Sequence, residues 1–539
     1  MYDDRIRPPH RVRGMAVVPN RVPFFRPNPR VLGDQIILAA PPQGARVPKD
    51  ADVGQGVRWC CVAKIRGVGV ACRLHVISFR TMKFRSVVKE HWPQGAWFAR
   101  WSKSEQTVHV LHGSGVIVRA DRLFEGVWDG DFAAGRFVEA TVFTGSGIRL
   151  QADSVELIPS LDFQNACVFV NPDSSDDEQC ASNSLLCWLT QTGNALDPTW
   201  GDYYIDLVRV FSVGIVDELP TLRLKDGARV GVVALAGWSI SAQGGERMPS
   251  AEVDWFEPNF ASYRAFIKGV MARIQENATS PDRPKTLGVK TTLSTGYDSV
   301  AVSVLARELG VTEAITILGR EDARELGKRL GLKLRARHRS RSLLLPNRVV
   351  HECFAMPIGQ NRPLAIFDRE LTDSVLFSGQ GGDITWGMKR WFEDERLRAP
   401  NFHAMVLISQ LEHRLRVGYS LVAVGVIGNR RADRVMAITT SPEMAAFQEG
   451  ERGRPIPRRI GVEAGIPAEL FGQTKTAGAI AAPEVFSGLW NRSFKKFLRS
   501  VPDPTATAYR REDYPNFYAS PYRWTMHWAH EQMKDRYRD

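Results

Sequence analysis

The segment Leu293-Ser294-Thr295-Gly296-Tyr297-Asp298-Ser299 lies between a predicted strand, residues 286–293, and a predicted helix, residues 299–309. Ser294, Thr295 and Gly296 can present backbone amides and hydroxyls to a phosphate, and a helix N-terminus adds partial positive charge. Gly296 permits close approach of the backbone, and Asp298 supplies a hard oxygen ligand for Mg²⁺. Because no Gly-Lys-Ser/Thr follows, the segment is not a Walker A loop. It predicts a phosphate-binding turn between a strand and a helix.

The same pattern continues on the C-terminal side of this segment. Apolar runs at 313–318 and 332–336 predict strands, and residues 320–330 predict a helix that ends at Gly331. The first helix has an apolar face and ends at Gly310. Strands that alternate with helices favour a doubly wound parallel sheet covered on both faces. We expect residues 256–539 to form this α/β domain.

A second glycine-rich segment follows another predicted strand, residues 374–377. It reads Ser378-Gly379-Gln380-Gly381-Gly382-Asp383. Three glycines and a terminal carboxylate directly after a strand suit a second loop that faces the same ligand. We therefore expect Asp383 to be a second Mg²⁺ ligand opposite Asp298.

Together the two segments resemble a known pair of motifs. The first is similar to the SGGxDS loop of the ATP-pyrophosphatase superfamily, and the second to the SGEGxDE segment of asparagine synthetase-like proteins. Thr295 replaces the first glycine of the former. The late segments Arg458-Arg459-Ile460, Gly465-Ile466-Pro467 and Lys475-Thr476-Ala477-Gly478 also resemble this family. The resemblance covers roughly residues 255–485.

The resemblance implies an enzyme that uses ATP and Mg²⁺ to adenylate a carboxylate, releases pyrophosphate, and passes the acyl group to an amine. It implies three catalytic residues, namely Lys475, Asp298 and Asp383, with Lys475 neutralising charge on the pyrophosphate and the acyl transition state. It further implies that ATP and pyrophosphate contact Leu293, Ser294, Thr295, Gly296, Asp298, Ser299, Ile317, Leu318, Ser378, Gly379 and Lys475, and that the acyl substrate lies near Gln380, Gly381 and Gly382. Gln380 stands where relatives carry Glu or Tyr, and a glutamine cannot act as a general base.

Residues 51–255 have a different character. Short β-branched and aromatic runs at 59–65, 68–77, 107–111, 116–118 and 137–143 predict an antiparallel β domain, followed by a helix that begins near Asn183. In asparagine synthetase this place holds a glutaminase with a cysteine directly after the initiator methionine. Here position 2 is Tyr2 and the first cysteine is Cys60. The comparison implies a degenerate glutaminase-like domain, preceded by a Pro/Arg-rich arm at residues 1–50.

Loss of the glutaminase is the arrangement of β-lactam synthetase and lasso-peptide cyclases. It implies a small-molecule or peptide carboxylate as substrate and intramolecular cyclisation of a peptide or natural-product precursor. A partner protein that delivers a precursor peptide is a further expectation, with the arm as a docking segment. Two alternatives remain: a tRNA-modifying adenylating enzyme, and a pseudo-synthetase that only binds nucleotide.

Composition bears on these alternatives. The 539 residues carry a formal net charge of +12, which favours anionic partners. A basic run provides a motive for RNA binding: Lys328, Arg329, Lys333, Arg335, Arg337, Arg339 and Arg341. We nevertheless expect no nucleic-acid partner, because no RNA- or DNA-binding signature accompanies it. Seven cysteines without paired spacing favour a cytoplasmic protein, and no apolar stretch predicts a membrane span.

Overall fold

The computed structural model divides the chain into two compact units, residues 1–79 and residues 80–539. It describes residues 57–65, 70–78, 82–102, 104–161, 163, 166–173, 177–250, 253–319, 322–356, 362–388, 395–398, 410–448, 453–472, 490–501 and 521–538. In the first unit the described residues form an antiparallel hairpin of β1 (Val57–Ile65) and β2 (Val70–Ser78). The arm at residues 1–50 and Tyr2 lie outside the described residues.

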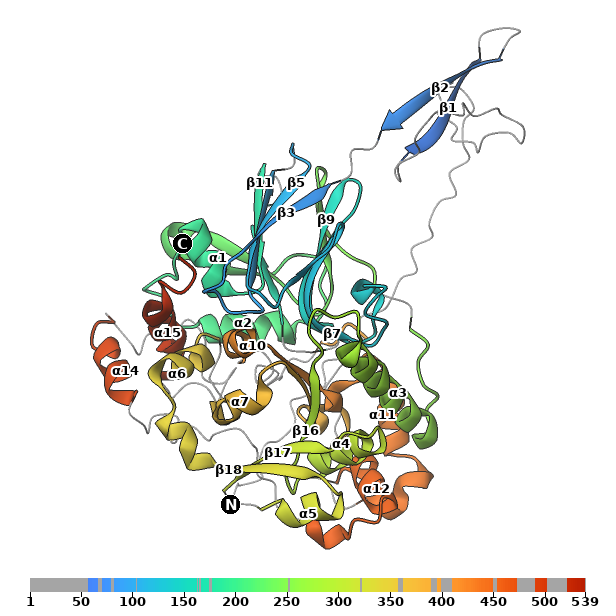
Figure 1. Ribbon diagram of the computed structural model, residues 1–539, viewed down its shortest axis with the longest axis vertical. Helices are drawn as coiled ribbons and strands as arrows, with labels where there is room; N and C mark the ends of the chain where they lie inside the picture. Colours follow the sequence, from blue (N-terminus) through green and yellow to red (C-terminus); the bar gives the residue numbers. More distant parts are fainter. Residues whose placement is uncertain are drawn as a thin grey trace, which may run out of the picture. The chain divides into compact units, whose positions relative to one another are not determined.

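The second unit begins with a β-sandwich (Figure 1). One sheet has the order β12-β13-β10-β11-β4-β5-β3 and the other β15-β14-β9-β8-β7-β6. Trp97, Leu123 and Val168 belong to one buried cluster, which fills the space between the sheets. The strands are β3 Lys83–Val88, β4 Trp97–Ser102, β5 Thr107–His112, β6 Ile117–Val118, β7 Arg122–Trp128, β8 Phe143–Leu150, β9 Ser154–Ile158, β10 Val168–Val170, β11 Glu178–Ser182, β12 Thr221–Arg223, β13 Arg229–Val233, β14 Trp238–Ser241 and β15 Gly244–Arg247.

The strand predicted at residues 137–143 is wrong. Phe137–Glu139 form a 3-10 turn, and strand β8 begins only at Phe143, opposite Trp128. Phe137 is fully buried and packs against Phe124, Trp128 and Phe143. Tertiary packing of the aromatic rings therefore overrides the β-propensity of this run. The named strands of the two sheets pair antiparallel as expected, except that β3 runs parallel to β5.

The C-terminal half contains a parallel sheet of order β18-β17-β16-β19-β20. Its strands are β16 Gly288–Thr292, β17 Glu313–Leu318, β18 Lys333–His338, β19 Ser374–Ser378 and β20 Tyr419–Ala423. Four of these strands match predicted ones. The molecule is thus a mixed α/β protein with several sheets, one of them parallel. Chain order reverses between β16 and β19, and ligands of open α/β sheets bind at the carboxyl ends of strands at such a reversal.

Helices cover both faces of the parallel sheet. Val375 and Phe377 of β19 pack into a cluster with α3, α4 and α12, whereas Leu376 packs into a second cluster with α6, α10 and α15. This burial on both faces explains the continuous apolar run that predicted β19. The helices are α1 Leu185–Thr192, α2 Tyr203–Ser212, α3 Phe260–Thr279, α4 Tyr297–Glu308, α5 Arg324–Arg329, α6 Asn347–Phe354, α7 Asp368–Leu371, α8 Gly382–Thr385, α10 Leu411–Val417, α11 Ala432–Thr439, α12 Pro455–Glu463, α14 Asn491–Leu498 and α15 Thr525–Met533.

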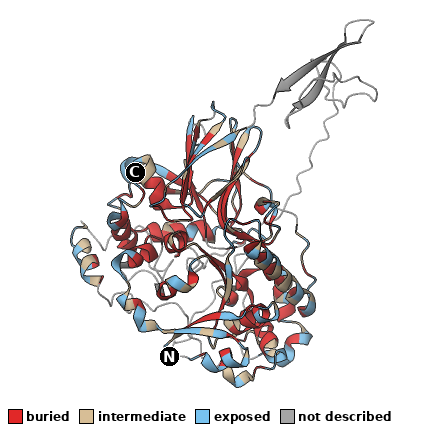
Figure 2. Cartoon of the chain, viewed as in Figure 1, coloured by how far each residue is buried: buried red, intermediate tan, exposed pale blue. Residues whose placement is uncertain are grey.

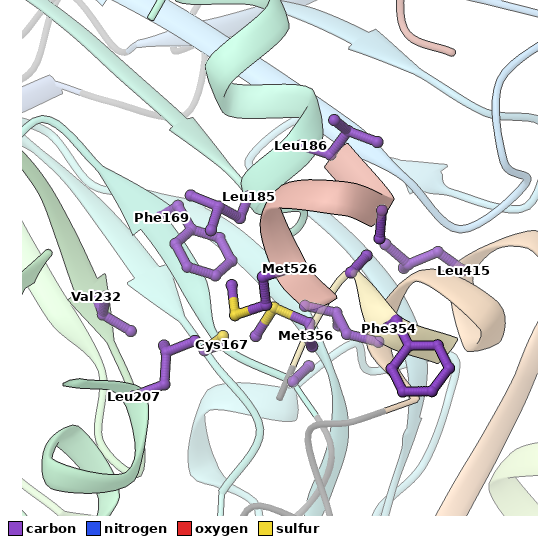
Figure 3. Close-up of a cluster of buried hydrophobic side chains, with 14 of the residues drawn as sticks. Cys167, Phe169, Leu185, Leu186, Leu207, Val232, Phe354, Met356, Leu415 and Met526 are labelled. Carbon is purple, nitrogen blue, oxygen red and sulfur yellow. The ribbon is translucent and has the colours of Figure 1, made fainter. Parts of the chain in front are cut away.

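The sandwich and the parallel sheet share a hydrophobic core. Phe169 and Val232 of the sandwich belong to the same buried cluster as Leu185 of α1, Leu415 of α10 and Met526 of α15, and Figure 3 shows Phe169 close to Leu185 and Met526. Residues on both sides of position 255 therefore pack together, and the domain boundary expected there stays a prediction. Within the described part of the chain, no helix has the length and hydropathy that a membrane span requires.

Candidate functional site

The predicted phosphate loop lies where β16 ends and α4 begins, and its own hydroxyls hold it. The Ser294 N–H donates to Ser299 Oγ at 2.8 Å, and Ser299 Oγ donates to the Thr292 carbonyl at 3.1 Å. The Gly296 N–H donates to Ser294 Oγ at 3.2 Å. These bonds fix the turn in place. They also mean that the amides of Ser294 and Gly296 are used inside the loop.

Helix α4 begins at the loop with Gly296 as its N-cap residue. A glycine has no side chain to accept hydrogen bonds from the first-turn N–H groups, so the positive end of the helix dipole faces the loop without a side-chain cap. Ser294 is exposed and residues 295–299 are partly exposed, whereas Leu293 is buried and packs in the core. Leu293 can therefore contribute only its backbone to a ligand.

The second predicted loop follows β19. The Gln380 N–H donates to Ser378 Oγ at 3.2 Å, and the Gly382 N–H donates to the Gly379 carbonyl at 3.1 Å. Gly381 has a φ of 79°, a left-handed conformation that favours glycine. This turn leads directly into the short helix α8, where Asp383 is exposed in the first turn.

The two loops touch each other at Asp298. A Cβ atom on Gly379 would lie 2.5 Å from the Asp298 carbonyl carbon, and a Cβ on Gly382 would lie 2.5 Å from Asp298 Cγ. Such distances are incompatible with any side chain at either position. Glycines 379 and 382 are thus required by the approach of the first loop. Segments more than 80 residues apart in sequence meet at the reversal of the sheet.

A third strand end completes the contact. After β20, a Cβ atom on Gly425 would lie 2.4 Å from the Gly382 nitrogen, and a Cβ on Gly381 would lie 2.3 Å from Val426 Cγ1. The loop at residues 378–382 therefore lies between Asp298, at the start of α4, and the turn at residues 424–426. On the other side of β16 from β19, Ile317 and Leu318 end the neighbouring strand β17, and the Leu293 N–H donates to the Ile315 carbonyl at 2.9 Å.

Arg454 is a site residue that the sequence did not identify. It precedes α12, and its Nη1 lies 3.6 Å from Asp298 Oδ2, with the two side chains 13% and 22% exposed. The predicted Mg²⁺ ligand thus has a cation beside it already. A single arginine far along the chain carries no motif, so only the fold could reveal it.

Lys475 lies outside the described residues. The described chain before it is anchored on the phosphate loop, because the Gly472 N–H donates to the Thr295 carbonyl at 2.7 Å. Phe471 packs edge-on against Tyr297, with ring centroids 5.6 Å apart. A Cβ atom on Gly472 would lie 2.0 Å from the Tyr297 ring. The position of this glycine is therefore set by the same loop.

The carboxylates of Asp298 and Asp383 are of the type that holds Mg²⁺ within a phosphate complex. Gly382 packs directly against the Asp298 carboxylate. Among the described residues, no group of three or more His, Cys, Asp or Glu side chains forms a protein-only metal site. A pair of carboxylates completed by phosphate oxygens is how proteins usually hold Mg²⁺.

Thiol chemistry has no support in the described residues. Cys167, Cys180, Cys187 and Cys353 are buried and form no disulfide. Burial raises the pKa of Cys167 to about 12 and raises the pKa of Cys187 well above its usual value. Since the thiolate is the nucleophile, Cys167 and Cys187 are inert packing residues.

The chain matches no family model, and no curated protein matches it. The geometry of the loops therefore carries the functional argument.

Proposed function

We propose that this protein is an ATP-dependent carbon–nitrogen ligase that forms AMP and pyrophosphate. The observation that carries the proposal is the packing of the 294–299 loop against the 378–382 loop through Asp298, Gly379 and Gly382. A Ser-Thr-Gly turn that opens an uncapped helix meets a glycine-rich turn at the carboxyl edge of a parallel sheet where chain order reverses. This is the position and the chemistry expected of a nucleotide phosphate site.

In the proposed reaction, an oxygen of the substrate carboxylate attacks the α-phosphorus of ATP. The bond to the pyrophosphate breaks, giving an acyl-adenylate and pyrophosphate. A substrate amine then attacks the acyl carbon, the bond to AMP breaks, and the amine loses its proton. The products are an amide, AMP and pyrophosphate.

The chain's own groups would act on the charge of the leaving pyrophosphate. The N-terminus of α4 and the Ser294 hydroxyl would donate hydrogen bonds, and Arg454 offers a positive charge beside Asp298. By resemblance Lys475 would add a second cation. Asp298 and Asp383 would hold Mg²⁺, which neutralises charge on the phosphate oxygens when bound.

In this proposal the N-terminal half has a structural role and takes no part in the reaction. Trp97 is completely buried between the sheets, and its Nε1 donates to Ser146 Oγ at 3.0 Å. The Trp97 backbone N–H donates to Asn183 Oδ1 at 3.0 Å. We interpret residues 51–255 as a degenerate glutaminase-like domain and residues 256–539 as the adenylating domain, which suits a substrate that already contains its amine. Cyclisation of a peptide or natural-product precursor is the reaction class we favour.

The experiment traps the acyl-adenylate with hydroxylamine, an amine that needs no binding site. Wild type, ATP, Mg²⁺ and a peptide extract should give AMP and hydroxamates, with AMP in excess because the substrate's own amine captures part of the acyl-adenylate. Asp298→Asn should abolish both, because it removes a charge at the contact of the two loops. Asp322→Asn is the matched control, since Asp322 is exposed, pairs with Arg324, and should not matter. Equal loss in both variants, or hydroxamate formation by Asp298→Asn, would contradict the proposal.

A further inference from the structure

The basic run of the sequence forms an open edge of the parallel sheet. Strand β18 is the last strand on its side, and among the described residues no strand pairs with its outer edge. Lys333, Arg335, Ala336 and His338 are exposed, as Figure 2 shows along this strand. The opposite edge strand, β20, is buried along its whole length. Among the described strands of this sheet, β18 is therefore the exposed edge.

The backbone of β18 alternates between the sheet and the outer side. The Lys333 N–H donates to the Thr312 carbonyl at 2.7 Å, so the polar groups of Lys333 face inward. Because N–H and C=O groups of successive strand residues point to opposite sides, those of Leu334, Ala336 and His338 face outward. An outward row of this kind is a template for an added strand.

The side chains on this edge are positively charged. Lys333 and Arg335 lie on one face of the strand, two residues apart. The acidic residues nearby form ion pairs with other cations, since Glu370 pairs with Arg337, Glu325 with Arg329, and Glu313 with Lys290. Lys333 and Arg335 also lower the pKa of Glu313 by their charge, so this carboxylate offsets part of the positive potential of the strand. Among the described residues, Lys333 and Arg335 make no ion pair within 4.0 Å. An added strand with acidic residues at alternate positions would place carboxylates beside them.

The observations favour one occupant. The phosphates of a nucleic acid would pair with the positive side chains, but a nucleic acid has no peptide backbone to pair with the outward N–H and C=O groups of β18. The chain's own arm is rich in arginine and proline, so it carries the same charge as β18 and lacks many of the N–H donors that a strand needs. An extended acidic peptide can hydrogen-bond to the outward main-chain groups of β18, and its carboxylates can pair with the positive side chains.

We propose that an acidic segment of a peptide substrate adds to β18 as a sixth strand of the sheet. This inference rests on the proposed ligase function and names its substrate class. His338 ends β18 at the same carboxyl edge at which the 294–299 loop leaves β16. Strands are spaced about 4.8 Å apart, so the added strand lies about 14 Å from β16. A peptide that runs parallel to β18 would bring its following residues to the site.

The test measures binding without ATP. The probe is a fluorescent peptide in which Glu alternates with Thr, and the control peptide alternates Lys with Thr. We expect wild type to bind the Glu probe, more weakly at high salt, and to ignore the Lys probe. Ala336→Pro should weaken binding about tenfold, because it removes an outward N–H and blocks the edge while leaving the inner ladder intact. Ala336→Val is the matched control and should bind like wild type.

Arg335→Glu is a second variant, which should also weaken binding without any change of backbone. The inference is overturned if the Glu probe does not bind wild type, or if Ala336→Pro and Ala336→Val bind it equally. Tighter binding of a single-stranded RNA that is indifferent to Ala336→Pro would also overturn it, in favour of nucleic acid. Because this binding assay contains no ATP, its result does not depend on the ligase reaction. Peptide binding here, together with no AMP formation in the separate hydroxylamine assay, would retain the docking strand and reject the ligase.

Discussion

Gly382 lies so close to Asp298 that a single methyl group tests the contact between the two loops. Gly382→Ala would place a carbon 2.5 Å from Asp298 Cγ. We expect ATP affinity to fall about 5- to 150-fold, since overpacking of this size shifts neighbouring atoms at a cost of ~1–3 kcal/mol. Calorimetric titration with ATP and Mg²⁺ measures it.

Gly288→Ala is the control for that variant. A Cβ there would meet only the end of the Lys290 side chain at 3.8 Å, and Gly288 lies at the opposite end of β16. Unchanged affinity in Gly382→Ala would mean that the two loops do not form one nucleotide site.

Arg414 and Glu125 form a buried ion pair that joins the parallel-sheet half to the sandwich. Their two hydrogen bonds measure 2.6 and 2.8 Å, and the side chains are 2% and 5% exposed. Arg414→Met should cost about 3–5 kcal/mol of unfolding free energy, because it leaves the Glu125 carboxylate buried without its cation. Urea denaturation measures the loss. The double variant Arg414→Met with Glu125→Leu should recover part of it, and a double variant as unstable as the sum of both singles would contradict this explanation.

At the scale of elements, the interface of α6 and α15 should respond to acid. Burial lowers the pKa of His351 and of His530 from 6.5 to about 4. His351 packs edge-on against Trp528, and His530 Nε2 hydrogen-bonds the Ala355 carbonyl at 2.9 Å. Unfolded histidines gain a proton near pH 6.5, whereas the folded ones resist until about pH 4. Their contribution is therefore complete above pH 6.5 and is lost as the pH falls toward 4, by up to ~3 kcal/mol each.

Unfolding free energies measured across that pH interval test this. His351→Phe keeps a ring against Trp528 and removes one titrating group, so its stability should fall less steeply with acid than that of wild type. Equal slopes in the two proteins would show that His351 does not titrate on unfolding.

Local patterns in the sequence predicted most of the parallel sheet, because its elements depend on short-range signals. The strand at Glu313–Leu318 has the predicted bounds, and both glycine-rich segments follow strands as expected. The strand prediction at residues 137–143 failed because the burial of the Phe137 ring depends on strands that lie elsewhere in the sequence. Arg454 and Gly472 reach the phosphate loop from distant parts of the chain. Such contacts arise only when the fold brings the segments together, so no local pattern encodes them.

For the whole molecule, the structure joins a β-sandwich and a parallel sheet through one core, with the candidate site at the sheet's reversal and a basic edge beside it. An enzyme of this construction would hold an extended substrate on one surface while its carboxylate reacts on another. The functional claim depends on which phosphorus of ATP is attacked, since attack at the α-phosphorus and attack at the γ-phosphorus leave different nucleotides.

Identification of the nucleotide product is therefore the most direct test. Purified wild type is incubated with ATP, Mg²⁺ and a peptide extract, and the products are resolved by phosphorus NMR. We predict AMP and pyrophosphate in equal amounts, formed only when the extract is present. ADP and phosphate would contradict the account, because they would place the reaction at the γ-phosphorus.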